Sequence, residues 1–97
     1  MKDKLKCIIS HYGVREQLKY FHSEVYELTE AILDYQYVEV YNGTPAQKAQ
    51  RKHVAEEIAD VWIMLSQFKE YYGITTKEID EIINYKVNRQ LERIAND

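Results

Sequence analysis

The apolar residues of this chain recur at alternating steps of four and three, the spacing that places side chains on one face of an α-helix. Stretches with this pattern are separated by Gly13, by Asn42-Gly43 and by Gly73. No stretch shows the strict alternation of apolar and polar residues that is typical of a β-strand. The pattern therefore predicts an all-α fold with helices at about residues 2–11, 14–40, 45–72 and 76–95.

Each of the three longer predicted helices carries an apolar stripe. In the second helix it consists of Val14, Leu18, Phe21, Val25, Leu28, Ile32 and Tyr35. In the third it consists of Val54, Ile58, Val61, Leu65, Phe68 and Tyr72, and in the fourth of Ile79, Ile83, Val87, Leu91 and Ile94. Such stripes are typical of helices that pack along their length. We expect one four-helix bundle domain over residues 1–97, with two long central helices, a short N-terminal helix and a C-terminal helix.

Two predicted helices begin with recognisable capping residues. Thr44 precedes Pro45, which suits the first helical position, and Gln47 is placed to complete a capping box with Thr44. Thr75 and Glu78 have the same relationship at the start of the fourth helix.

Composition narrows the functional classes. The 97 residues are 45% hydrophobic and 30% charged, with a net charge of -3 and one cysteine. This balance predicts a globular chain, gives no broad electrostatic basis for binding nucleic acid, and rules out an intramolecular disulfide. A chain this short buries a modest core, so we expect oligomerisation to complete it. We see no signal peptide and no membrane-spanning apolar run, so we expect a cytoplasmic protein.

Four acidic residues form two pairs, Glu24 with Glu27 and Glu57 with Asp60. Each pair has i, i+3 spacing, which places both carboxylates on one helix face with Cβ atoms about 5–6 Å apart. No lysine or arginine lies three or four residues from any of them. Like charges on one face are unfavourable without a compensating cation, and Mg²⁺ prefers oxygen ligands of this kind.

The pairs also occupy matching positions beside the apolar stripes. Each acid comes directly before a stripe residue, so it lies about 100° around the helix from the stripe. If the two long helices pack antiparallel, the pairs converge at a half-buried site. We therefore predict Glu24, Glu27, Glu57 and Asp60 as ligands of Mg²⁺, with Mn²⁺ as an alternative.

Other nearby residues offer weaker candidates. Glu30 continues the row of Glu27, and either Glu30 or Glu56 could join a second metal ion, although Glu56 is expected to face solvent. His53 precedes Glu57 by one turn and could hydrogen-bond to it. A carboxylate-bridged di-iron site would use Glu-x-x-His pairs, and the chain has none.

The last helix ends in a basic row, Lys86, Arg89 and Arg93, at helical spacing. Arginine forks and lysine ammonium groups bind phosphate oxygens, so this row is a candidate phosphate-binding group. An alternative is that the cations only complement the helix dipole near the C-terminus. Among the aromatic residues, Tyr12, Tyr20 and Trp62 are candidates for stacking on a nucleobase, although most aromatic side chains at helical spacing pack in a core.

These features together resemble one family. The run from Gln17-Leu18 through Ser23-Glu24-Val25-Tyr26-Glu27-Leu28, followed by Glu56-Glu57-Ile58-Ala59-Asp60-Val61 and by the basic tail, is similar to the MazG-like nucleotide pyrophosphohydrolases of the all-α NTP pyrophosphatase superfamily. Many members have a further glutamate where this chain has Ser23, which predicts one carboxylate fewer for a second metal ion.

The resemblance implies an Mg²⁺-dependent hydrolase that converts a nucleoside triphosphate to the monophosphate and pyrophosphate. It implies metal binding by the four acids and triphosphate contacts from Lys86, Arg89 and Arg93. A carboxylate that the metal does not saturate could accept the proton from water, and we expect Glu24 or Glu27 to be this base. A homodimer or a dimer of dimers is the implied assembly. Two alternatives stay open: a phosphoribosyl-ATP pyrophosphohydrolase, and a helical interaction module without catalysis.

Overall fold

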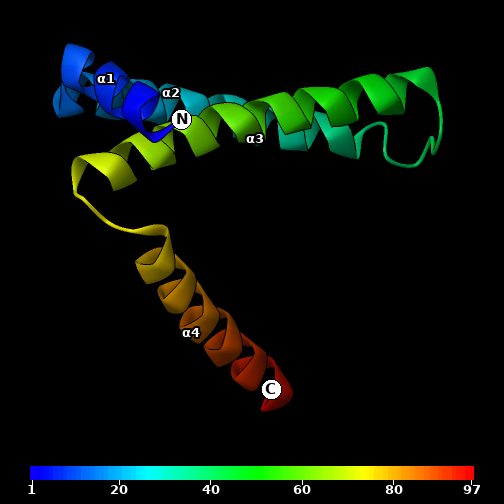
Figure 1. Ribbon diagram of the computed structural model, residues 1–97. Coiled ribbons are helices and arrows are strands. Elements are labelled where there is room, and N and C mark those ends of the chain that lie inside the picture. Colours follow the sequence, from blue (N-terminus) through cyan, green and yellow to red (C-terminus); the bar gives the residue numbers. More distant parts are fainter.

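The computed structural model describes all 97 residues and contains only helices. They are α1 (Lys2–Tyr12), α2 (Val14–Gln36), α3 (Pro45–Tyr71) and α4 (Thr76–Ala95), as Figure 1 shows. The all-α prediction with four helices is confirmed. The prediction that the second helix reaches Val40 is wrong: residues 37–40 form turns, and the N–H groups of Tyr37 and Val38 donate to carbonyl oxygens three residues back, at 3.2 and 3.0 Å.

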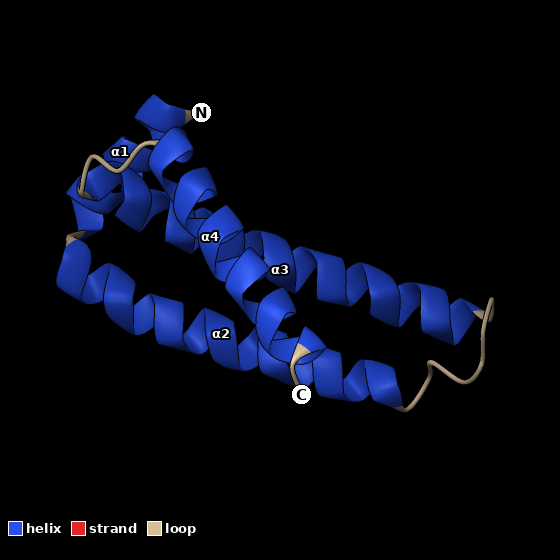
Figure 2. Cartoon of the chain, turned by 90° about the horizontal axis from the view of Figure 1, so that it is seen from below, coloured by secondary structure: helices blue, strands red, loops and turns tan.

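Helices α2 and α3 lie side by side and antiparallel, and α1 packs against both near the N-terminal end of α2 (Figures 1 and 2). Helix α4 contacts none of the other three helices. It extends away from the C-terminal end of α3, after the turn at Gly73 (Figure 1). A single chain therefore does not close the expected four-helix bundle, because its fourth helix has no packing partner within the chain.

The helix starts follow the capping residues closely. At α4, the predicted capping box is confirmed: Glu78 N–H donates to Thr75 Oγ1 at 3.1 Å, and Thr75 N–H donates to Glu78 Oε2 at 2.8 Å. At α3, Thr44 Oγ1 accepts from Gln47 N–H at 3.2 Å. The Gln47 side chain, however, accepts from the N–H of Gly43 at 2.7 Å, because the Thr44 N–H already donates to the Tyr41 carbonyl.

The packed faces of α2 and α3 differ from the predicted stripes. The buried residues are polar as well as apolar, namely Gln17, Glu24 and Ala31 on α2 and Glu57, Met64 and Gln67 on α3. Several residues of the predicted stripes stay substantially exposed, among them Leu18 and Ile32 at 46% and Leu65 at 53%. The expectation that the acids lie beside the buried seam is therefore wrong for Glu24 and Glu57, which lie within it.

The reason is that two stripes with the same period overlap on α2. Phe21, Leu28 and Tyr35 belong to both, and all three are half-buried. The packed stripe adds Gln17, Glu24 and Ala31. The predicted stripe instead adds the next residue after each of these, namely Leu18, Val25 and Ile32. Both repeat every seven residues, so periodicity alone does not decide which stripe faces α3. At the interface, the rings of Phe21 and Phe68 meet edge to face with centroids 5.7 Å apart.

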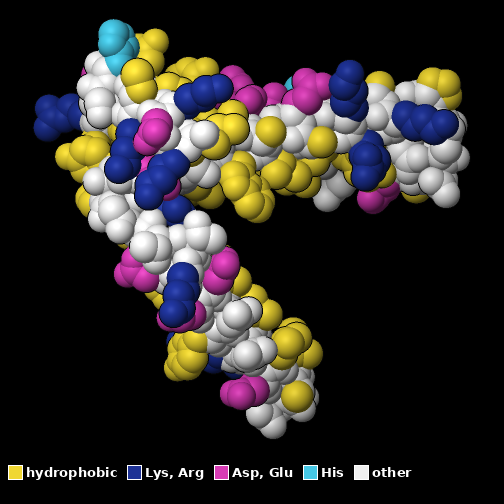
Figure 3. Space-filling view, in the orientation of Figure 1, with side chains coloured by type: hydrophobic (Ala, Val, Ile, Leu, Met, Phe, Trp, Pro, Cys, Tyr) yellow, Lys and Arg dark blue, Asp and Glu magenta, His cyan; other side chains and the backbone are white.

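The stripe that is not used leaves an uncovered apolar face on the α2–α3 layer. We define this face by six residues, Leu18, Val25, Ile32, Ile58, Trp62 and Leu65. Figure 3 shows hydrophobic side chains along the lower edge of this layer and along α4, and acidic side chains along its upper edge. None of the four helices has the combination of length and apolar character that crossing a membrane requires.

The chain is also extended for its size. Its accessible surface is 7875 Å², whereas a folded monomer of 11.6 kDa is expected to expose about 5,800 Å². Its radius of gyration is 16.9 Å, compared with about 12.5 Å for a compact domain of the same length. Only Leu5, Ile9, Ala31 and Met64 form the fully buried apolar core. The single chain therefore leaves much apolar surface without a packing partner.

Candidate metal centre and adjoining cavity

Three of the four predicted acids meet between α2 and α3. Glu24 projects from α2, and Glu57 and Asp60 project from successive turns of α3. One carboxylate oxygen from each lies within 4.8 Å of the other two. Because α2 and α3 run antiparallel, residues far apart in the sequence come to the same level of the interface. The structure thus brings together Glu24, Glu57 and Asp60 as one acidic cluster.

Burial distinguishes two of these acids from ordinary surface carboxylates. Glu24 is 5% exposed and Glu57 is 9% exposed, whereas Asp60 faces solvent. The Oε2 atoms of Glu24 and of Glu57 are buried and have no hydrogen-bond partner. A buried carboxylate oxygen without a donor is costly for the folded chain, so a cation or a donor from outside the chain would stabilise these two atoms.

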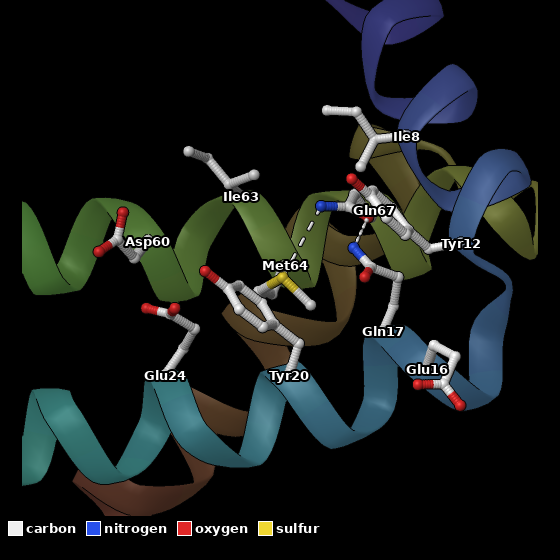
Figure 4. Close-up of a pocket in the computed structure, with 10 residues that line it drawn as sticks. All are labelled: Ile8, Tyr12, Glu16, Gln17, Tyr20, Glu24, Asp60, Ile63, Met64 and Gln67. Carbon is white, nitrogen blue, oxygen red and sulfur yellow. Dashed lines mark hydrogen bonds between the residues drawn. The ribbon is translucent and has the colours of Figure 1, made fainter.

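Without a bound cation, the negative charges around the cluster repel one another and destabilise the ionised form of Glu24. Burial raises the pKa of Glu24, and the negative charges of Glu27, Asp60 and Glu57 raise it further, although hydrogen bonding from Tyr20 opposes them. The same interaction with Glu24, together with the surrounding negative charges, raises the pKa of the Tyr20 hydroxyl. Figure 4 shows this hydroxyl directed toward Glu24. The electrostatics favour a positive charge at this position.

The chain supplies little positive charge there. No lysine or arginine forms an ion pair with a member of the cluster. His53 Nδ1 lies 4.0 Å from Glu57 Oε1, too far for the hydrogen bond expected from the sequence. His53 therefore offers at most a weak charge interaction when it is protonated.

The donor set fits a hard divalent cation. Carboxylate oxygens are the preferred ligands of Mg²⁺, and oxygens on opposite sides of that ion are about 4.2 Å apart. Adjacent oxygens on the ion are closer, about 3.0 Å apart, so side-chain rotation must bring the three oxygens, which lie within 4.8 Å of one another, nearer together for them to share one ion. The exposed Asp60 leaves the site open on one side, where water or a phosphate could complete the coordination.

The fourth predicted ligand, Glu27, lies outside this cluster. It is exposed on α2, one turn beyond Glu24, and its charge is near enough to raise the pKa of Glu24. Glu30 and Glu56 are also exposed and lie outside the cluster.

The predicted phosphate-binding residues are on the isolated helix. Lys86, Arg89 and Arg93 are exposed on α4, which does not touch α2 or α3. The Arg89 guanidinium lies 5.6 Å from the centroid of the Tyr85 ring. Within one chain, the structure does not bring these three residues to the acidic cluster.

A cavity of about 550 Å³ adjoins the cluster, and Figure 4 shows the ten residues of α1, α2 and α3 that line it. Glu24 and Asp60 lie at one end. At the other end, toward α1, lies a pair of glutamines, Gln17 and Gln67. Tyr20 lies between the two ends, and Tyr12 of α1 lies close to the glutamine pair. Trp62, which the sequence also suggested for stacking, is not part of this cavity.

The sequence pattern did not identify the glutamine pair as part of the packed interface. Gln17 is 7% exposed and Gln67 is 2% exposed, and Gln17 Nε2 donates to Gln67 Oε1 at 2.7 Å. A signal was present: Gln17 precedes Glu24 by seven residues, and Gln67 follows Asp60 by seven. Polar residues thus recur at heptad spacing from the acids on the same helices.

Comparison of the chain with family models, with curated proteins and with solved structures finds no match. The function is therefore inferred from the residues and geometry of the chain itself.

Proposed function

We propose that the chain is an Mg²⁺-dependent nucleoside triphosphate pyrophosphohydrolase of the MazG-like kind, which cleaves an NTP or dNTP to the monophosphate and pyrophosphate. The observation that carries the proposal is the acidic cluster, in which Glu24 and Glu57 each bury a carboxylate oxygen without a partner. A structural role alone does not account for two unpaired buried carboxylates that face each other across a helix interface.

In this proposal Glu24, Glu57 and Asp60 hold Mg²⁺ or Mn²⁺. The ion supplies charge compensation at the phosphate oxygens and a lowered pKa for a bound water. The two buried carboxylates have fixed surroundings, since both lie between α2 and α3. Asp60 is exposed, so it is on the side from which a triphosphate approaches.

Glu27 is the best candidate for the base that accepts a proton from the attacking water. It lies outside the group of three ligands, so its carboxylate is not committed to the metal. It remains one turn from Glu24 on the same side of α2, within the reach of a hydrogen bond through one water. Glu24, the alternative base, is assigned to the metal because its unpartnered oxygen is buried.

The proposal places the phosphate-binding row of α4 in a second copy of the chain. Lys86, Arg89 and Arg93 do not reach the cluster of their own chain, whereas α4 presents an apolar stripe with no partner. The surface exposed beyond that of a compact monomer is about 2,000 Å², which is sufficient for a stable dimer interface. A homodimer or a dimer of dimers would bury this surface and combine acids from one subunit with cations from another.

The decisive experiment measures pyrophosphate release from the eight common NTPs and dNTPs, with and without Mg²⁺. The proposal expects turnover of at least one nucleotide that stops when a chelator is added. Absence of turnover across the panel, with folded protein and with metal present, would contradict the proposal.

The same assay, with phosphoribosyl-ATP added to the substrates, distinguishes the two alternatives. A phosphoribosyl-ATP pyrophosphohydrolase would prefer phosphoribosyl-ATP over every common nucleotide by kcat/KM. A non-catalytic interaction module is favoured by one observation, the uncovered apolar face and the unpartnered α4. Such a module would self-associate or bind a partner normally and would show no metal-dependent turnover on any substrate.

A further inference from the structure

The buried glutamine pair opens into the cavity with unused hydrogen-bonding groups. The bond from Gln17 Nε2 to Gln67 Oε1 uses one donor and one acceptor. No hydrogen bond within the chain reaches Gln17 Oε1, and Gln67 Nε2 donates only to the Met64 sulfur, at 3.7 Å. A thioether sulfur is a weak acceptor, so the pair retains the unbonded Gln17 Oε1 acceptor and unused N–H donors on both amides.

This property does not depend on how the amide oxygens and nitrogens are assigned. If both side chains are flipped, one N–H···O bond still joins them, and an unbonded amide oxygen and unused N–H donors remain. A pair of amides therefore matches a planar ligand edge that carries an adjacent donor and acceptor. Nucleobases have such edges, and in DNA recognition a single glutamine amide pairs with adenine through a donor and an acceptor of this kind.

The rest of the cavity suits a flat ring next to a polar chain. Ile8, Ile63 and Met64 provide apolar walls beside the amides. The rings of Tyr12 and Tyr20 line the same space and are 58% and 56% exposed, so their faces are accessible to a stacked base. The volume of about 550 Å³ is within the range of pockets that enclose small organic ligands.

The two ends of the cavity are spaced for a nucleotide. Gln17 and Glu24 are seven residues apart on α2, about 10 Å along the helix axis. This is comparable to the distance from the pairing edge of a base to the 5′ oxygen of its sugar. A base at the amides would thus direct its phosphates toward the acidic cluster.

We infer that Gln17 and Gln67 form a nucleobase-reading subsite, in which the amide pair hydrogen-bonds the edge of the base and Tyr12 or Tyr20 stacks on its face. This inference rests on the proposed pyrophosphohydrolase function. It adds that specificity for the base resides at the end of the cavity opposite the metal ligands. It makes these two glutamines specificity-determining residues.

The test observes the side-chain amides directly. Nucleosides, which have no phosphate, are titrated into ¹⁵N-labelled protein in the presence of a chelator, and the Gln17 and Gln67 NH₂ signals are assigned from Gln17→Met and Gln67→Met variants. We expect at least one nucleoside to shift both signals, whereas ribose 5-phosphate, which lacks a base, shifts neither. Each variant should weaken binding of that nucleoside by about tenfold, the effect of losing one well-made hydrogen bond.

Gln50→Met is the matched control, because Gln50 lies on α3 outside the cavity and donates to the Ala31 carbonyl at 3.1 Å. It should leave nucleoside affinity unchanged. If a cavity variant fails to fold, the nucleoside-induced shifts of the glutamine NH₂ signals in the wild-type protein still test the subsite. Pyrophosphate release without any nucleoside-induced shift of these signals would overturn the subsite and leave the proposed function standing. Shifts without turnover would support the subsite and contradict the proposed function, and the absence of both would overturn both.

Discussion

Glu24 on α2 and Glu57 on α3 each present a buried carboxylate oxygen without a hydrogen-bond partner at the same level of one helix interface. Two such groups are destabilising in an isolated chain, since each must lose its hydration without receiving a donor. Asp60 adds a third oxygen from the solvent side. A bound cation would compensate the charges of these carboxylates, so metal binding should raise the free energy of unfolding. The predictions below follow from this link.

The first prediction is that divalent cations stabilise the wild-type chain through Glu57. At a free Mg²⁺ concentration of about 100 times Kd, binding adds about 2.7 kcal/mol to the free energy of unfolding. Glu57→Gln should lose most of this increment, measured as the rise in melting temperature, while its helical circular dichroism is unchanged. Glu39→Gln, an exposed change of the same charge outside the cluster, should retain it. An equal increment in both variants would remove Glu57 from the ligands.

A second prediction concerns the metal-free protein. Glu24→Gln should increase the free energy of unfolding by about 1 kcal/mol in urea titrations with a chelator at neutral pH, because it removes a buried charge that hydrogen bonding from Tyr20 only partly offsets. Glu81→Gln on α4 makes the same change of net charge at an exposed position and should have little effect. A loss of stability in Glu24→Gln would show that the carboxylate has a favourable partner within the chain.

The third prediction follows from the raised pKa of Glu24. A folded pKa above the ordinary value of 4.5 means that the folded chain binds this proton more tightly than the unfolded chain does. The contribution of Glu24 to stability is therefore fully present below 4.5 and is lost as pH rises through the raised value. The groups that face it are Tyr20 and Glu27 on α2 and Asp60 and Glu57 on α3.

The measurement compares urea unfolding of the wild type and of Glu24→Gln between about pH 4 and pH 8, with a chelator present throughout. The difference between the two curves isolates this carboxyl group from the other acids. It should favour Glu24→Gln increasingly as pH rises and then become constant. A difference that does not change with pH would mean that burial does not shift this group.

The fourth prediction is that the uncovered apolar face mediates self-association. Leu65 is 53% exposed within that face, so Leu65→Lys should shift the sedimenting species toward the monomer by introducing a charge into an apolar contact. Val40 is an equally apolar residue that is 77% exposed in the turn region away from this face. Val40→Lys should leave association unchanged. A wild-type chain that stays monomeric at tens of micromolar would contradict the prediction.

A fifth prediction tests whether acids and cations come from different subunits. Glu57→Gln and Arg89→Gln variants should each lose most pyrophosphate release when pure. Subunits mixed by unfolding and refolding together should regain activity, because one site in each mixed dimer combines intact acids with an intact α4. A mixture of Glu57→Gln with Glu24→Gln should regain none, since both changes affect acids supplied by the same chain. Equal recovery in both mixtures would contradict the shared site.

The sequence by itself determined the helices. Glycine interruptions, the Thr75–Glu78 capping box and apolar spacing are local features, and local hydrogen bonding and sterics suffice to place helix ends within a few residues. The same local reading identified Glu24, Glu57 and Asp60 as acids without neighbouring cations, and the structure brings these three together. It did not identify Gln17 and Gln67 as buried, because their seven-residue spacing from the acids does not show which face of each helix is packed.

Tertiary structure alone decided which face of each long helix is packed. Two stripes of equal period compete on α2, and only the rotation of α2 against α3 and α1 selects the one that buries Glu24 rather than the one that buries Val25. That rotation places the acids and the amide pair in the interface and leaves an apolar face and α4 uncovered. It depends on the summed contacts of three helices, which periodicity in one helix does not encode.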